Sequence, residues 1–83
     1  MPGKVAVIFQ VYADAGKEEA VKKEIVEKLN PKGVQLEEVA FGIKIIKVMF
    51  INDDQAGTTD KEEAELRKIS GVNEVEVIDE SLL

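Results

Sequence analysis

The order of strand-like and helix-like segments restricts the fold of this chain more than any other feature of its sequence. Four segments are rich in β-branched and aromatic residues, which favour strands, and two repeat an apolar residue every third or fourth position, as helices do. The predicted strands cover residues 4–12, 34–41, 42–51 and 72–78, and the predicted helices cover residues 17–29 and 60–70. The chain therefore runs in the order β-α-β-β-α-β.

The first predicted strand is expected to lie in the middle of a sheet. Successive side chains of a strand point to opposite faces. The face from Val5 to Val11 is wholly apolar, and the opposite face, which includes Gln10, is partly so, as in a central strand. The next two strands are joined by so short a connection that they are predicted to form an antiparallel hairpin. The apolar alternation slips between Leu36 and Val39, which indicates a bulge or a bent edge strand.

The last helix and strand complete one small domain. Thr59 and Glu62 have the spacing of a capping box, and Gly71 stands where a C-terminal helix cap is expected. Because crossover connections are right-handed in nearly all proteins, the full order predicts an α+β, ferredoxin-like βαββαβ sandwich, with two helices on one face of a four-stranded antiparallel sheet. Residues 1–83 are expected to form this single domain. Proteins with this fold have many different activities, so the fold alone does not indicate a function.

The composition excludes several kinds of function. The chain has 17 acidic and 11 basic residues, a net charge of −6, which opposes binding to nucleic acid. It has no cysteine and no histidine, and therefore lacks thiol chemistry, the commonest general base and the commonest metal ligand. No apolar run approaches the ~20 residues of a membrane helix, and Met1–Lys4 begins no signal peptide. We expect a cytoplasmic protein that is not an enzyme and that has no catalytic residue, cofactor or metal.

The sequence motifs that would bind phosphate, RNA or a metal ion are incomplete in this chain. An acylphosphatase-type site needs an arginine in a phosphate-binding loop, whereas Arg67, the single arginine, falls inside the second helix. An RNA-recognition sheet needs several exposed aromatics, and only Tyr12 is expected there. Asn52–Asp54 offers consecutive ligands without the spacing or the later glutamate of a calcium loop. Ala15–Lys17 lacks the first glycine and the final hydroxyl of a P-loop.

Two surfaces remain as candidates for binding. The sheet face opposite the helices is expected to be apolar, which is typical of an association surface, although its side chains can also shield one another or pair two domains. The side chains expected on it are Ile8, Tyr12, Ile43, Ile45 and Met49 among Gln10 and Lys47. At the hairpin tip Phe41 precedes Gly42. An aromatic residue there either protrudes toward a partner or, if the hairpin folds inward, joins the core.

The segment Ala40–Ile45 (AFGIKI) resembles the archaeal elongation factor 1-beta family and the C-terminal exchange domain of its eukaryotic relatives. That family places an aromatic-Gly-Ile/Leu segment at this hairpin and follows it with a hydrophobic strand. An acidic loop with Gly-Thr comes next, here Asp53–Thr58, and a Val-x-Val-x-Asp-like strand closes the domain, here Val75–Asp79. Residues 5–29 match in pattern and length, and the resemblance thus covers essentially the whole chain.

The resemblance implies a guanine-nucleotide exchange factor for elongation factor 1-alpha, the GTPase that delivers aminoacyl-tRNA to the ribosome. In eukaryotic relatives the hairpin aromatic inserts into the GTPase. The partner-binding residues implied here are Phe41, Gly42, Ile43, Lys44, Leu82 and Leu83. Those relatives also use a lysine just before the last residue to disturb the magnesium site of the GTPase. Asp79–Leu83 contains no lysine, so that step is either absent here or performed by another group. A monomer is expected.

A second class of function fits the same fold, namely a small-molecule-binding regulatory domain that dimerises through its sheet. Such domains bind effectors in glycine-rich loops, and the turns Asp14–Gly16 and Ala56–Gly57 are the candidates in this chain. A third class, an acyl-group hydrolase, is disfavoured by the missing histidine and by the position of Arg67. Release of labelled GDP from elongation factor 1-alpha separates the first class from the other two.

We expect the chain to come from a thermophile and to melt above about 80 °C. It has 10 lysines and 12 glutamates but only three asparagines and three glutamines, and this bias is typical of hyperthermophile proteins. Differential scanning calorimetry measures the melting temperature directly. A reversible transition near about 55 °C, the ordinary mesophile range, would contradict the prediction.

Overall fold

The computed structural model describes residues 3–40, 42–53 and 58–82 of the chain, apart from the side chain of Thr58. Four strands and two helices follow one another in the predicted order. They are β1 (Lys4–Ala13), α1 (Glu18–Leu29), β2 (Gly33–Ala40), β3 (Ile43–Asp53), α2 (Thr58–Arg67) and β4 (Val72–Leu82).

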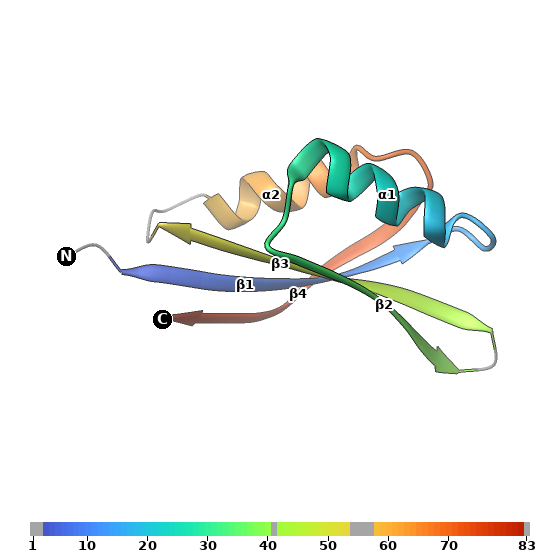
Figure 1. Cartoon of the computed structure of the whole chain (residues 1–83), viewed down its shortest axis with the longest axis horizontal. Coiled ribbons are helices and arrows are strands. Elements are labelled where there is room, and N and C mark those ends of the chain that lie inside the picture. Colours follow the sequence, from blue (N-terminus) through green and yellow to red (C-terminus); the bar gives the residue numbers. More distant parts are fainter. Residues whose placement is uncertain (1–2, 41, 54–57, 83) are drawn as a thin grey trace.

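The strands form one antiparallel sheet in the order β2-β3-β1-β4. Both helices lie on one face of this sheet, and the other face carries no helix (Figure 1). β1 is central, as its wholly apolar face and its partly apolar opposite face predicted, and β2 is an edge strand. The ferredoxin-like α+β fold expected from the sequence is therefore confirmed.

The hydrophobic core lies between the helices and the sheet. The face of β1 from Val7 to Val11 is fully buried, and Phe9 at its centre meets Phe50 of β3 with ring centroids 5.8 Å apart in an edge-to-face arrangement. The other core residues are Val21, Ile25, Ile46, Val48, Leu66, Ile69 and Val75. Val26, the residue after Ile25 in α1, is 43 % exposed, because it points about 100° around the helix from Ile25.

A β-bulge interrupts the pairing of each edge strand, β2 and β4. The pairing of β2 with β3 shifts between Glu38 and Ala40, which leaves Val39 as the extra residue and confirms the irregularity predicted there. The pairing of β4 with β1 shifts beside Val77, where Ile78 is the extra residue. Pairing then resumes up to Leu82, and β4 is four residues longer at its end than the alternation predicted.

The boundaries of α2 differ from the capping-box prediction. The helix begins at Thr58, so Thr59 lies inside it and is not its cap. The Glu62 carboxylate accepts a hydrogen bond from the Asn52 amide of β3 (2.8 Å). This tertiary hydrogen bond uses the carboxylate that a capping box would need. Gly71 has a φ of +94°, and a β-carbon at this position would lie 3.0 Å from Cγ2 of Val21, so both backbone and packing demand glycine.

Candidate functional site

The tip of the β2–β3 hairpin is the first part of the predicted partner-binding surface. Ala40 pairs with Ile43, so only two residues connect the strands. Gly42 has a φ of +72°, a conformation in which glycine avoids the strain of a side chain. Phe41, the residue before it, lies outside the described residues. The hairpin extends beyond the two helices at one end of the molecule (Figure 1), which measures 44 × 23 × 17 Å along its principal axes.

Two aliphatic side chains at this tip are exposed to solvent. Ile43 is 56 % exposed and Val39 is 51 % exposed. Lys44 is also exposed and lies opposite Glu38 in the ladder. Exposed aliphatic side chains on a rigid two-stranded ribbon are suited to contact with another protein. Sequence reasoning selected Ile43 and Lys44 but missed the exposure of Val39, although its break in the alternation marked the position.

The C-terminal part of the predicted surface lies at the other end of the sheet. Leu82 is 73 % exposed and pairs with Val5, which in turn pairs with Asn52 of β3. Asn52 is nine residues from Ile43 along β3, or about 30 Å at ~3.3 Å per residue. The structure therefore does not bring the hairpin tip and Leu82 together (Figure 1). Leu83 lies outside the described residues.

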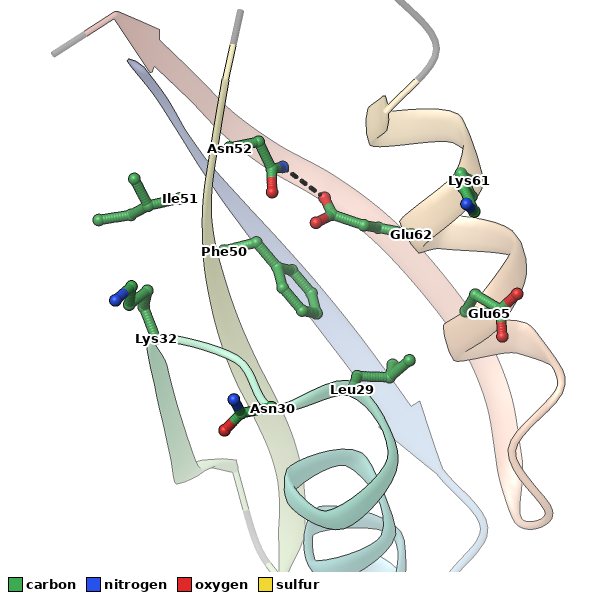
Figure 2. A pocket seen from close by; sticks show the side chains of 9 residues that line it. All are labelled: Leu29, Asn30, Lys32, Phe50, Ile51, Asn52, Lys61, Glu62 and Glu65. Carbon is green, nitrogen blue, oxygen red and sulfur yellow. Dashed lines mark hydrogen bonds between the residues drawn. The ribbon is translucent and has the colours of Figure 1, made fainter. Parts of the chain in front are cut away.

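A cavity of about 370 Å³ lies between the end of α1 and the first turns of α2, over β3 (Figure 2). Leu29 and the Phe50 ring form its apolar part. The Asn52 amide and the Glu62 carboxylate point toward each other across it and are hydrogen-bonded (Figure 2). The other lining residues are Asn30, Lys32, Ile51, Lys61 and Glu65. Its volume falls within the range of small-molecule sites, but its central polar groups already satisfy each other.

The remaining charged groups that were considered as sites have structural partners. Asp53 forms an ion pair with Lys4 (2.9 Å), and Asp54 lies outside the described residues. The Arg67 guanidinium donates to the carbonyl of Val75 (2.9 Å) and pairs with Glu63, which ties α2 to β4. Across the described residues, no buried side-chain nitrogen or oxygen lacks a hydrogen-bond partner. In the same residues, no helix is long and apolar enough to span a membrane.

Partial burial raises the pKa of the Glu62 carboxyl, and the hydrogen bond from Asn52 offsets part of this effect. A carboxyl whose pKa is raised in the folded state keeps its proton there to a higher pH than in the unfolded state. The free energy of unfolding therefore falls as the pH rises from the ordinary pKa of glutamate through the raised one.

We expect Glu62→Gln to increase stability at pH 7 and to leave it unchanged at pH 4 or below. Glutamine keeps an oxygen that can accept the hydrogen bond from Asn52, but it carries no charge to desolvate. The gain in melting temperature should stay below the ~4–8 °C that 1 kcal/mol produces in a domain of this size. Thermal melts of both proteins across pH 4–8 measure it. A lower melting temperature at pH 7 would show that the ionised carboxylate stabilises the fold.

Comparison with known proteins identifies the family. Residues 15–83 match the model of the EF-1 guanine nucleotide exchange domain. A protein named elongation factor 1-beta from Methanoculleus marisnigri is 30 % identical over 83 residues, which cover 98 % of this chain and 99 % of that protein. The protein of that name from Methanothermobacter thermautotrophicus is 41 % identical over 66 residues, covering 74 % and 73 % of the two chains. That from Aeropyrum pernix is 38 % identical over 82 residues, covering 89 % and 90 %.

The matched region includes both helices, the hairpin and β4. It therefore contains every residue assigned to the partner-binding surface. The family is the one that the AFGIKI segment and the closing Val-x-Val-x-Asp-like strand indicated. The chain belongs to the EF-1 guanine nucleotide exchange domain family.

Proposed function

We propose that this chain is a guanine-nucleotide exchange factor that promotes release of GDP from elongation factor 1-alpha during translation elongation in the cytoplasm. The observation that carries the proposal is the match of residues 15–83 to the exchange-domain family, which includes the exposed hairpin. On this proposal residues 1–83 act as a single exchange domain and not as an enzyme.

Exchange of this kind requires no nucleophile, general base or cofactor. A protein that binds the nucleotide-free GTPase more tightly than the GDP-bound form must weaken GDP binding by the same factor. What it needs is a rigid surface that fits the altered nucleotide site. The β2–β3 ribbon supplies such a surface, because its two strands pair almost to the tip and Ile43 stands exposed at the turn.

On this proposal the hairpin is the part that acts on the nucleotide site. Leu82, about 30 Å away along the sheet, would then contact a separate region of the GTPase and hold the complex together. The segment Asp79–Leu83 contains no lysine that could enter a magnesium site. The contacts proposed for this chain are therefore the apolar ones of Ile43 and Leu82.

The charge of the chain supports a basic partner. A domain with a net charge of −6 is steered toward a positively charged GTPase surface, and salt screens this attraction. The second-order rate of GDP release should therefore fall between 50 mM and 500 mM salt.

The direct test loads an archaeal elongation factor 1-alpha with fluorescent GDP and measures its release in excess unlabelled GDP, with and without this chain. We expect the release rate to rise with the concentration of the chain and to saturate when the complex is fully formed. A parallel titration without nucleotide measures complex formation alone. If a complex forms but GDP release is not accelerated, the exchange function is wrong. If no complex forms, the assignment of elongation factor 1-alpha as the partner is wrong.

A further inference from the structure

The face of the sheet that carries no helix, here called the open face, has apolar side chains on both sides of one polar pair. Cross-strand pairing aligns Met49 of β3 with Ile8 of β1, and Ile45 with Tyr12. Ile51 and Ala6 continue the same face toward the other end. Most of these side chains are half-buried, and Ile45 is only 3 % exposed. Gln10 of β1 and Lys47 of β3 pair with each other between these two apolar pairs. The open face is therefore apolar on both sides of one central polar pair.

The charges of the open face are not balanced. Lys4 pairs with Asp53 (2.9 Å), and Lys47 pairs with Glu37 (3.2 Å). β4, along one border, presents a column of three exposed carboxylates, which are those of Glu74, Glu76 and Asp79. In the part of the chain that the structure describes, no lysine or arginine nitrogen lies within 4.0 Å of these three carboxylates.

The opposite border of the open face is hollow. Gly33 of β2 lies beside Met49, and its missing side chain opens a shallow groove of about 360 Å³. The groove is lined mainly by Ile8, Gln35, Lys47 and Met49. A β-carbon added at Gly33 would lie 3.6 Å from Cε of Met49, an ordinary contact, and no positive φ requires glycine there. The chain thus keeps a groove that a larger residue could fill without strain.

We propose that the open face docks an amphipathic helix of a protein partner, whose apolar stripe is bordered on one side by lysines or arginines. The sheet is about 14 Å wide from β2 to β4, and a helix with its side chains is about 10–12 Å wide. Along β1, Glu74 and Asp79 lie opposite Tyr12 and Ile8, and so they are about 13 Å apart. Basic residues at positions i, i+4 and i+7 of a helix span about 10 Å on one flank and match this column.

The same charges argue against a second copy of the chain as the occupant. The two lysines of the open face are already paired, and a face-to-face dimer would add three more carboxylates from a molecule with a net charge of −6. A basic helix instead supplies the missing counter-charges, while its large apolar side chains enter the groove above Gly33.

The test uses the whole chain and a helical peptide of 18 residues with a leucine stripe and lysines along one flank. NMR titration should shift the amides of β1, β3 and β4, and a peptide with glutamate in place of lysine should bind much more weakly. Glu74→Gln with Glu76→Gln should weaken binding about three- to tenfold. Glu19→Gln with Glu27→Gln removes the same charge from exposed positions of α1 and should have little effect. Gly33→Val should weaken binding by filling the groove.

Three outcomes would overturn the proposal. The amide shifts could be confined to the helices or to the hairpin tip. The two double variants could bind the peptide equally well, which would show that net charge, and not the position of the carboxylates on β4, determines binding. The free chain could sediment as a dimer whose open-face amides are protected and do not respond to the peptide, in which case a second copy occupies the face.

Discussion

Replacing Ile43 by aspartate should lower the rate of GDP release at least tenfold while the fold remains intact. Ile43 is 56 % exposed at the hairpin tip, where a partner would bury it, and a buried unpaired carboxylate opposes that contact. Large apolar side chains at the centre of an interface commonly contribute ~2 kcal/mol or more, which is over tenfold in affinity. Fluorescent GDP release measures the first effect, and a urea titration should show a change in stability below ~1 kcal/mol.

Val26→Asp is the matched control for this experiment. Val26 is 43 % exposed on α1, away from the hairpin, so the same change of side chain should leave GDP release unaltered. Phe41→Ala extends the test to the residue that the family resemblance selected, and the same loss of release is expected. If Phe41→Ala instead lowers stability by several kcal/mol and leaves release per folded molecule normal, the aromatic belongs to the core and the contact lies elsewhere.

Phe9→Ala should reduce the free energy of unfolding by about 3–5 kcal/mol, the largest stability effect that we expect in this chain. Its side chain is completely buried in the central strand, and its ring packs on that of Phe50. Truncation removes this contact and leaves a cavity that the paired strands on either side cannot close. Urea unfolding at 25 °C measures the loss, and Phe9→Leu, which fills more of the space, should cost clearly less. A cost below about 1 kcal/mol for the alanine variant would contradict the packing described.

The parts of the fold that depend on local alternation were predictable. The phase of β1, the hairpin and the buried face of β3 follow from the regular spacing of apolar residues, which a strand translates directly into faces. The glycine at position 71 was predictable, but not its role as a helix cap, because α2 already ends at Arg67 and Gly71 lies in the turn before β4. Its left-handed φ still selects glycine. The AFGIKI segment added the family and, with it, the position of the candidate site.

The parts that depend on distant contacts were not predictable. Ile78 is an extra, unpaired residue in β4, and strand pairing continues after it as far as Leu82. The alternation of apolar residues within the segment does not indicate that extra residue. Glu62 bonds to Asn52 of another element, which local spacing misread as helix capping. The separation of the hairpin tip from Leu82 follows from the antiparallel register of the sheet, which the sequence implies only once all strand pairs are known.

The strand order β2-β3-β1-β4 also determines how a nascent chain can fold. The first half of the polypeptide, through β2, contains no two strands that hydrogen-bond to each other, because β3 separates β1 from β2. β1 must wait for β3 on one side and for β4, the last strand made, on the other. Such long-range pairing gives a high contact order and slow, all-or-none folding. A chain stalled in synthesis after Ala40 therefore has helix α1 but no sheet to pack it against.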